Sequence, residues 1–472
     1  MKLHAVCMAC LCALVSGTAL AGDVTLDTAG PIGSCYVEMY YGLVDGGGGW
    51  VAGSDFFGDP STTWTAIVDT GASAFVMSDS VRQAYAAGGN PVPLQAGLTF
   101  DDTGFGGSEQ FLVTAGLNVM VAPGGEYANT EDHTPYRPYA PLGQTQTVMA
   151  VRQTAGEFID PDILGMSLLE GRVLHVQPNA AYLSPSFLVM MPGSLEDPAP
   201  AAGSGALFVP VALQHFLPLP QTVDIGRHPV LPMRVRAAAA DDFASRSAIF
   251  DSGSPVNFVS ESFALEAGID LSSPDLSIPV GGIGPESTWR DGYYVDAVAL
   301  ALGNGREGDS LLLGNSAVFV IPDDEMPAYP GPGGETLHLE AILGNGVFSP
   351  GQDDLFSFDI NDSPFTEWYV DTRDPDHSYI VLVAPLPKID GDANRDGRVD
   401  YLDLGALAGN YRKSSGATWA MGDFTEDGAV DYLDLGILAG NYRYGTRGAS
   451  APEPATLLLL IPLALLRRRR HA

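Results

Sequence analysis

Short apolar runs separated by glycine, proline and polar residues recur along most of the chain. Their β-branched and aromatic content predicts strands at 34–42, 62–68 and 111–121, the last with apolar and polar residues in alternation. Two later runs, at 356–369 and 378–383, predict closing strands. The 56 glycines and 35 prolines also favour turns and strands over long helices. The pattern therefore predicts a mainly β architecture over this part of the chain.

One of these apolar runs ends in a motif that the chain repeats. Ala-Ile-Val leads into Asp-Thr-Gly at 69–71, and Ala-Ile-Phe leads into Asp-Ser-Gly at 251–253. Ile-Leu-Gly follows each motif, at 163–165 and 342–344, so the spacings are 163 − 69 = 94 and 342 − 251 = 91 residues. A single Asp-Thr-Gly is a weak signal, because all three residues are common in turns. Four matches at nearly equal spacing indicate a duplicated unit.

The duplication predicts two lobes in a chain of 472 residues, which is too long for one hydrophobic core. A stretch rich in Pro, Gly and Ala at 192–206 is typical of a connection between them. We therefore expect an N-terminal lobe at 22–200 and a C-terminal lobe at 201–386.

Two carboxylates that a duplicated fold brings together can catalyse hydrolysis by water. Like charges about 3 Å apart cannot both ionise, so Asp69 and Asp251 would share one proton. One carboxylate can then deprotonate a water molecule while the other protonates the scissile carbonyl, and the pair titrates as a unit. The residues expected to support this dyad are Thr70, Gly71, Ser252 and Gly253. Two aspartate turns on unrelated strands are the alternative interpretation.

A glycine-rich segment, Thr103–Ser108, lies between predicted strands in the first half. Glycine permits positive φ, which suits the tip of a mobile hairpin. The second half has a similar segment at 280–284, at a comparable distance after its aspartate. An ordinary turn explains either segment, but their equivalent placement favours a flap over the substrate. Its tip would be Phe105, Gly106 and Gly107.

The composition changes abruptly after Pro385, where two acidic loops begin 31 residues apart. In each, oxygen ligands stand at positions 1, 3, 5, 9 and 12, position 7 offers a backbone carbonyl, and glycine stands at position 6. Calcium prefers six to eight such oxygens. The expected ligands are Asp392, Asn394, Asp396, Arg398, Asp400 and Asp403 in the first loop and Asp423, Thr425, Asp427, Ala429, Asp431 and Asp434 in the second.

Thr425 replaces a stronger ligand, so we expect weaker binding by the second loop. Near-identical helices are predicted after the loops, at 401–412 and 432–443. A pair of solvated acidic turns without metal is the alternative. Catalysis by the aspartates would need no cofactor.

The two ends of the chain have the composition of targeting signals. Residues 1–21 combine Lys2, an apolar stretch and a small-residue cleavage site, which predicts an export signal peptide. The apolar stretch 455–466 is short for a bilayer span and is followed by four arginines, which favours a transient membrane anchor. Three of the four cysteines lie in the leader, so the exported protein would keep Cys35 and have no internal disulfide. A net charge of −34 argues against nucleic acid as a partner.

The two aspartate motifs and the two Ile-Leu-Gly sequences resemble those of the bilobal pepsin-like aspartic proteases. This resemblance implies two pseudo-symmetric β-barrel-like lobes, with Asp69 and Asp251 at the floor of a cleft and a peptide bound across it as an extended strand. Each Ile-Leu-Gly would pack beneath its own catalytic loop. The sequence departs from the family at Ala72, where serine is common, and at Phe105, which stands in place of the flap tyrosine. It also lacks the familiar disulfides and prosegment.

Residues 388–446 are similar to dockerin domains, small helical modules whose two EF-hand-like loops fold on calcium and dock onto cohesins. Residues 450–472 resemble a PEP-CTERM sorting signal, which an exosortase-type enzyme processes. Together these features predict an exported aspartic endopeptidase with a calcium-dependent docking module, left at the cell surface, in the periplasm or outside the cell. The alternatives are a non-catalytic surface or matrix protein that binds peptides and a dockerin-anchored accessory of a polysaccharide-degrading assembly.

Overall fold

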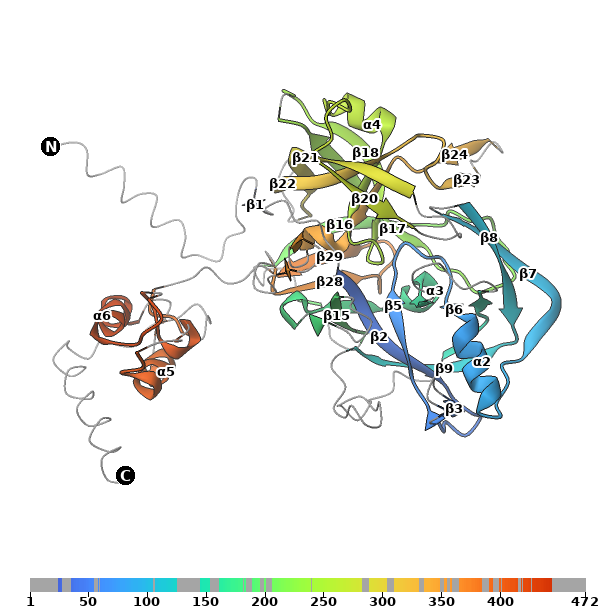
Figure 1. The fold of residues 1–472 in the computed structure, drawn as a ribbon, viewed down its shortest axis with the longest axis horizontal. Helices are drawn as coiled ribbons and strands as arrows, with labels where there is room; N and C mark the ends of the chain where they lie inside the picture. Colours follow the sequence, from blue (N-terminus) through green and yellow to red (C-terminus); the bar gives the residue numbers. More distant parts are fainter. Residues whose placement is uncertain are drawn as a thin grey trace. The chain divides into compact units, whose positions relative to one another are not determined.

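Figure 1 shows the computed structural model of the chain, in which residues 18–384 form one compact unit and residues 385–472 belong to a second. The structure describes residues 24–27, 35–54, 58, 60–104, 107–124, 145–152, 161–180, 182–183, 189–195, 199–200, 206–238, 240–281, 288–303, 310–330, 335–348, 352–354, 357–358, 365–383, 390–393, 399, 401–414, 417, 419–425 and 427–443. The predicted signal peptide and sorting tail lie outside these ranges.

The larger unit is mainly β, and 23 strands of its described residues belong to one continuous sheet. Its first half contains β1 (Val24–Asp27), β2 (Cys35–Leu43), β3 (Gly53–Ser54), β4 (Pro60–Ser61), β5 (Trp64–Val68), β6 (Val76–Met77), α2 (Asp79–Ala87), β7 (Leu94–Gly104), β8 (Gly107–Thr114), β9 (Leu117–Pro123), β10 (Thr145–Thr147), β11 (Ala150–Val151), β12 (Asp162–Leu164), α3 (Met166–Leu169), β13 (Val173–Val176), the 3₁₀ turn η1 (Pro178–Ala180), β14 (Tyr182–Leu183) and β15 (Val189–Ser194).

The second half repeats much of this order. It contains β16 (Leu207–Gln214), β17 (His228–Arg236), β18 (Ala244–Asp251), β19 (Asn257–Ser260), α4 (Glu261–Glu266), β20 (Leu276–Val280), β21 (Thr288–Ala301), β22 (Ser310–Ile321), β23 (Ala328–Pro330), β24 (Thr336–His338), β25 (Ala341–Gly344), η2 (Asn345–Phe348), β26 (Gln352–Asp354), β27 (Ser357–Phe358), β28 (Glu367–Asp371) and β29 (Ser378–Val383).

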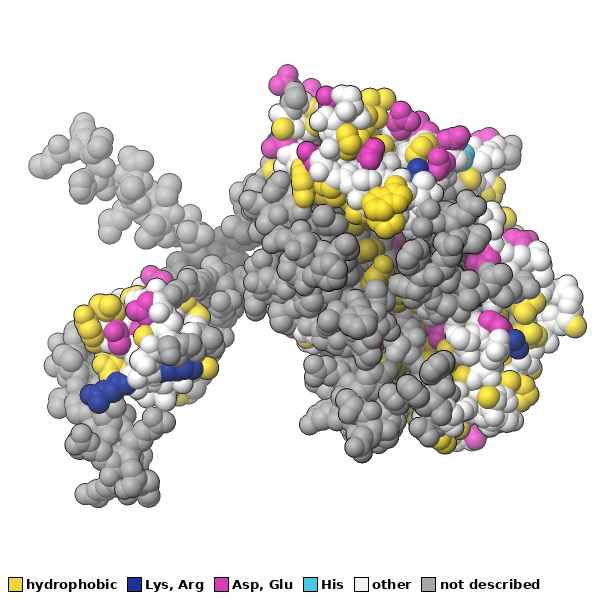
Figure 2. All heavy atoms as spheres, in the orientation of Figure 1, with side chains coloured by type: hydrophobic (Ala, Val, Ile, Leu, Met, Phe, Trp, Pro, Cys, Tyr) yellow, Lys and Arg dark blue, Asp and Glu magenta, His cyan; other side chains and the backbone are white. Residues whose placement is uncertain are grey.

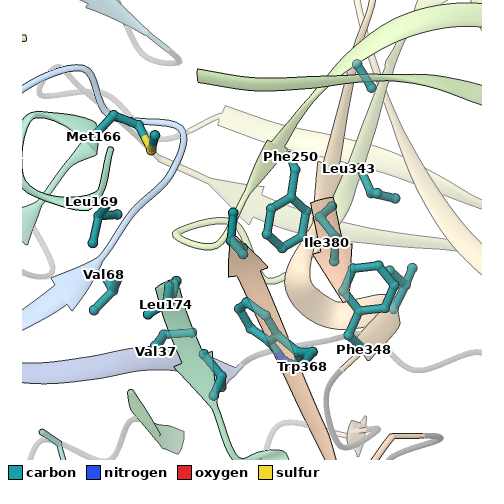
Figure 3. Packing of buried hydrophobic residues seen from close by; sticks show 14 of the residues in the cluster. Val37, Val68, Met166, Leu169, Leu174, Phe250, Leu343, Phe348, Trp368 and Ile380 are labelled. Atoms are coloured by element: carbon teal, nitrogen blue, oxygen red, sulfur yellow. The ribbon is translucent and has the colours of Figure 1, made fainter. Parts of the chain in front are cut away.

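The two halves share strands as well as repeating them. β15, β13, β28, β29 and β16 pair in that order, so strands of the first half and of the second form one antiparallel layer. β1, the first strand of the first half, pairs in parallel with β22 of the second half. A single large hydrophobic cluster includes residues from both halves, among them Val68, Phe250 and Trp368 (Figure 3).

The strands predicted at 34–42, 62–68 and 378–383 are confirmed by β2, β5 and β29. The prediction of one strand at 111–121 is wrong, because β8 ends at Thr114 and β9 begins at Leu117. Between them, the Ala115 N–H donates to the Pro93 carbonyl at 2.8 Å. The prediction at 356–369 is likewise divided between β27 and β28.

The smaller unit contains α5 (Tyr401–Asn410), the 3₁₀ turn η3 (Trp419–Met421) and α6 (Tyr432–Asn441). Both helices end two residues before the predicted ends, since Arg412 and Arg443 take left-handed φ values of 72° and 80°. Each of these arginines donates its N–H to the other repeat, Arg412 to the Val430 carbonyl and Arg443 to the Val399 carbonyl. The smaller unit is therefore also built from two reciprocal copies.

None of the described helices is both long and apolar enough to cross a membrane. Figure 2 shows acidic side chains spread over the described surface of the larger unit, with few basic ones among them. This agrees with a chain of 57 acidic and 23 basic residues.

Candidate active site

The two aspartate motifs occupy equivalent places at the ends of equivalent strands. β5 pairs in parallel with β12 so that Val68 lies opposite Leu164, and β18 pairs in parallel with β25 so that Phe250 lies opposite Leu343. In both halves the strand that ends in the aspartate motif therefore lies beside the Ile-Leu-Gly strand of the same half, in the same register. β6 and β19 then return antiparallel to β12 and β25.

The glycine of each Ile-Leu-Gly leaves room for the neighbouring loop. A Cβ atom on Gly165 would lie 2.1 Å from the Ala74 carbonyl oxygen, and one on Gly344 would lie 2.2 Å from that of Val256. Both distances are far below a van der Waals contact, and the obstructing atoms are backbone. This close approach explains why glycine follows Ile-Leu in both copies.

The residue after each aspartate ties the two halves together. The Thr70 hydroxyl donates to the Phe250 carbonyl at 2.7 Å and accepts from the Ser252 N–H at 2.9 Å. The Ser252 hydroxyl donates to the Val68 carbonyl at 2.8 Å and accepts from the Thr70 N–H at 3.0 Å. Both side chains are fully buried, so these four reciprocal bonds fix one loop against the other.

The two carboxyl groups meet where these loops cross. Asp69 and Asp251 share a side-chain hydrogen bond. A Cβ on Gly71 would lie 2.4 Å from Asp251 Cγ, and one on Gly253 would lie 2.4 Å from Asp69 Cγ. The glycines thus allow each carboxyl to lie against the opposite loop. Each carboxylate also accepts backbone N–H groups of its own loop, Asp69 from Gly71 at 2.7 Å and Asp251 from Gly253 at 2.8 Å.

Burial raises the pKa of both aspartates, and the negative charge of Asp69 raises that of Asp251 further. As whole residues, both aspartates keep partial exposure to solvent. Because the two groups interact strongly, the raised pKa belongs to the pair. The pair can hold one proton while carrying one negative charge, which is the state required for acid and base catalysis together.

Two supporting residues were not among the sequence predictions. The Asn345 side chain donates to the Ser252 carbonyl at 2.6 Å, and the imidazole of His228 lies 3.1 Å from the Thr70 carbonyl. Asn345 directly follows Ile-Leu-Gly in the second half, so its position was a usable signal. His228 lies 158 residues from Thr70, and no motif marks it.

The hairpin expected to cover the site is described except at its tip. β7 and β8 pair up to Gly104 opposite Gly107, and β20 and β21 form the corresponding hairpin in the second half. Phe105 and Gly106 lie outside the described residues, as does most of the segment 280–284.

The acidic loops lie in the smaller unit. Asn394, Asp396, Arg398 and Asp400 of the first loop lie outside the described residues. Asp392 and Asp403 are buried, and Asp403 accepts the Ala393 N–H at 2.8 Å. Asp434 of the second loop accepts the equivalent Phe424 N–H at 2.9 Å.

Positions 1, 3 and 12 of the second loop converge. The Thr425 hydroxyl lies 3.4 Å from a carboxylate oxygen of Asp423 and 3.0 Å from one of Asp434. Asp427 and Asp431 accept backbone N–H groups within the loop. Across the described part of the chain, no three His, Cys, Asp or Glu side chains are grouped so that they could hold a metal ion. A calcium loop also uses hydroxyl and carbonyl oxygens, such as those of Thr425 and Ala429.

The sequence matches no protein-family model and no curated protein. Among solved structures, the chain is similar to an aspartic proteinase from Irpex lacteus, with 10% sequence identity and a TM-score of 0.37. The match covers 74% of this chain and 96% of the proteinase.

Proposed function

We propose that the larger unit is a pepsin-like aspartic endopeptidase whose dyad is Asp69 and Asp251. The observation that carries this proposal is the pair of carboxyl groups held together by four reciprocal hydrogen bonds between the duplicated loops. A protein that only binds peptides does not need two like charges brought together in a desolvated site, since that arrangement raises their pKa at a cost in stability.

In the proposed mechanism the dyad carries one proton. The ionised carboxylate takes a proton from a water molecule, whose oxygen attacks the scissile carbonyl carbon, and the protonated carboxyl donates its proton to the carbonyl oxygen. The carboxyl group that took the proton from water then donates it to the leaving nitrogen as the C–N bond of the tetrahedral intermediate breaks. The other carboxylate takes back the proton from the former carbonyl oxygen, which restores the dyad. The hydroxyls of Thr70 and Ser252 keep the carboxyl groups in position, and the peptide binds as an extended strand.

The test is cleavage of a diverse peptide library by the chain from residue 22 onward, with and without a statine-type dyad inhibitor. We expect cleavage that the inhibitor and Asp251→Asn both abolish. No cleavage by folded protein between acidic and neutral pH would contradict the proposal and favour the peptide-binding alternative.

We further propose that the two acidic loops bind Ca²⁺ and make the smaller unit a dockerin-like module for a cohesin-like partner. The convergence of Asp423, Thr425 and Asp434 supports this, because these are the positions that would supply calcium oxygens. Asp423 also accepts the Gly428 N–H at 2.9 Å, which closes the loop about its glycine. When bound, the ion would neutralise clustered carboxylates.

Calcium binding can be measured by calorimetry on the whole chain, with Asp434→Asn as the variant and Asp374→Asn, an exposed aspartate of the larger unit, as its control. We expect Asp434→Asn to remove one binding event and the control to keep both. Equal titrations by all three proteins would contradict the second site. Export, processing of the tail by an exosortase-type enzyme and transient membrane anchoring are proposals that rest on the two ends of the sequence.

A further inference from the structure

The two aspartate loops each receive a side-chain hydrogen bond at the same backbone carbonyl, but from different sources. In the second half, Asn345 donates to the Ser252 carbonyl at 2.6 Å. In the first half, the equivalent carbonyl of Thr70 is 3.1 Å from Nδ1 of His228. Asn345 belongs to the same half as the loop it supports, whereas His228 begins β17 of the other half.

The difference follows from one side chain. Met166 and Asn345 occupy equivalent positions after Ile-Leu-Gly, and the Met166 N–H donates to the Ala72 carbonyl as the Asn345 N–H donates to that of Ser254. The backbone is thus the same in both halves. Met166 is fully buried in the hydrophobic core, and its thioether has no N–H to offer. The Thr70 carbonyl therefore needs a donor from elsewhere, since it lies in a buried residue.

The contacts of His228 define its protonation state. A carbonyl oxygen only accepts, so Nδ1 must carry the proton that is donated to Thr70. Nε2 lies 2.9 Å from the Ser73 hydroxyl, which can donate to it. The neutral Nδ1–H tautomer thus satisfies both contacts. Burial lowers the pKa of His228 to about 4, so this tautomer persists in moderately acidic solution.

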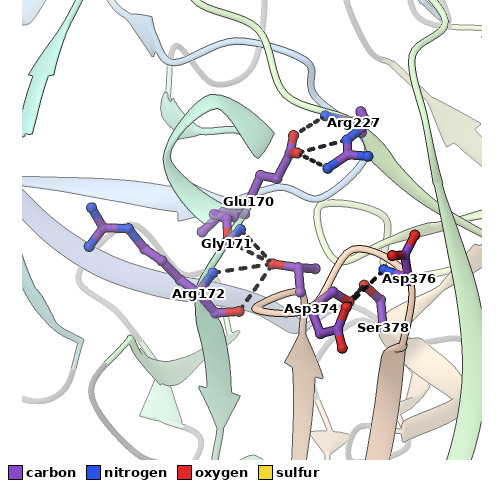
Figure 4. Close-up of polar contacts among 9 residues, drawn as sticks. Glu170, Gly171, Arg172, Arg227, Asp374, Asp376 and Ser378 are labelled. Carbon is purple, nitrogen blue, oxygen red and sulfur yellow. Dashed lines mark hydrogen bonds and ion pairs between the residues drawn. The ribbon is translucent and has the colours of Figure 1, made fainter.

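The chain before His228 is fixed along the Asp69 loop. The Gly226 N–H donates to the Ser73 carbonyl at 2.9 Å, and Ile225 bridges to Ala74. The carboxylate of Glu170, after α3, accepts the backbone N–H of Arg227 at 2.7 Å and its Nε at 2.7 Å (Figure 4). His215 and Glu170 are the titratable groups whose charges act on the imidazole. These contacts hold the ring against the loop.

We propose that His228 is a positioning residue that completes the Asp69 loop from the opposite half, by supplying the N–H that Met166 lacks. Its catalytic consequence rests on the proposed peptidase function, but its effect on the dyad does not. Through Thr70, which takes part in three of the four bonds between the loops, the imidazole holds Asp69 against Asp251. Without this N–H the Asp69 loop would relax, and more water would reach the dyad.

The test compares three variants in the whole chain. His228→Leu removes the donor, whereas His228→Asn keeps one, because Nδ2 of asparagine is attached to Cγ as Nδ1 of histidine is. The double variant His228→Leu with Met166→Asn restores a donor from the position that Asn345 occupies in the other half. NMR titration of ¹³C-carboxyl-labelled aspartates reads the dyad directly, with Asp69→Asn and Asp251→Asn to assign its signals.

We expect the raised dyad pKa to fall by about one unit in His228→Leu and to stay near the wild-type value in His228→Asn. The double variant should recover part of the shift. The kcat for peptide cleavage should fall about tenfold in His228→Leu, with little change in KM. The kcat should stay near the wild-type value in His228→Asn and recover in part in the double variant. Unchanged dyad titration in His228→Leu, or the same shift in His228→Asn, would overturn the proposal.

A second measurement uses the wild-type protein alone and so does not depend on whether a variant folds. Two-bond ¹H–¹⁵N spectra of the wild-type imidazoles should show one histidine as the neutral Nδ1–H tautomer at pH 5. Its protonation or the Nε2–H tautomer would also overturn the proposal. Dyad signals that shift in His228→Leu, in a protein that cleaves no peptide, would contradict the peptidase function while supporting the role of His228.

Discussion

The loops that carry Asp69 and Asp251 are alike in backbone and different in what supports them. Their strands, registers and cross-bonds are reciprocal, down to the glycine that each Ile-Leu-Gly places beneath its loop. Yet Asn345 supports one loop from within its half, and His228 supports the other from across the interface. The comparison shows that the duplication preserves the requirement for a donor, while the residue that meets it can change.

The largest effect should come from the carboxyl groups, where the halves are expected to be equivalent. Asp69→Asn and Asp251→Asn should each lower kcat by about a thousandfold or more, because either change removes the shared proton and the activation of water. Kinetics on the same peptide substrate will measure this.

Both variants should remain folded, as judged by denaturant unfolding at neutral pH, since an amide can keep the hydrogen bond between the side chains. Near-wild-type turnover by either variant would contradict the dyad. A loss in one variant alone would show that the two halves are not catalytically equivalent.

The glycines beneath the loops provide a test of the shared backbone. Gly165→Ala and Gly344→Ala should each lower the free energy of unfolding by about 3 kcal/mol or more, because the added Cβ would meet a carbonyl oxygen at 2.1 and 2.2 Å, respectively. Denaturant unfolding will measure the change.

Gly46→Ala is the matched control, since a Cβ at Gly46 would meet nothing within 4 Å. Its unfolding free energy should stay within about 0.5 kcal/mol of the wild type. A Gly165→Ala protein as stable as this control would show that the first loop can move away, and so that the halves differ in rigidity.

The reciprocal hydroxyls should show a smaller and equal effect. Thr70→Ala and Ser252→Ala each remove one donor and one acceptor that are fully buried, leaving a carbonyl and an N–H of the opposite loop unpaired. Each change should cost about 2–3 kcal/mol in the free energy of unfolding.

Thr70→Ser and Ser252→Thr keep the hydroxyl and serve as controls, with expected losses below about 1 kcal/mol. If only one alanine variant is destabilised, the four bonds are unequal in energy despite their matching geometry.

Much of this arrangement could be predicted from local sequence because short repeated motifs specify it. The paired strands and the two neighbouring aspartates were predicted from Asp-Thr-Gly, Asp-Ser-Gly and the two Ile-Leu-Gly sequences. The twin loops after Pro385 likewise predicted helices at the observed places. Both helices were predicted two residues too long, since arginine at 412 and 443 gives no sequence signal for a left-handed conformation.

The supporting residues were missed for a different reason. His228 reaches Thr70 through the pairing of distant strands, and its neighbours give no periodic signal. Its role becomes visible only when Met166 is placed opposite Asn345 and found to lack a donor. The strand β1 gives a similar case, because its pairing with β22 is a contact between the start of the chain and the second half.

The last expected effect separates the two donors by pH, because histidine titrates and asparagine does not. Burial lowers the pKa of His228 from 6.5 to about 4. The unfolded chain therefore protonates this histidine below pH 6.5, whereas the folded chain does so only below about pH 4. This stabilising contribution is present above pH 6.5 and is lost as the pH falls toward 4, with a slope of at most about 1.4 kcal/mol per pH unit. The dyad acts in the opposite sense: its raised pKa stabilises the protein at low pH and loses that effect as the pH rises.

Denaturant unfolding between pH 4 and 7 should therefore show a flatter loss of stability on acidification in His228→Asn than in the wild type. Asn345→Asp is the reverse test, since it places a titratable group at the Ser252 carbonyl and should introduce a new pH dependence in the second half. Equal pH profiles for the wild type and His228→Asn would mean that the imidazole takes up its proton without loss, and the two loops would then be supported in the same way.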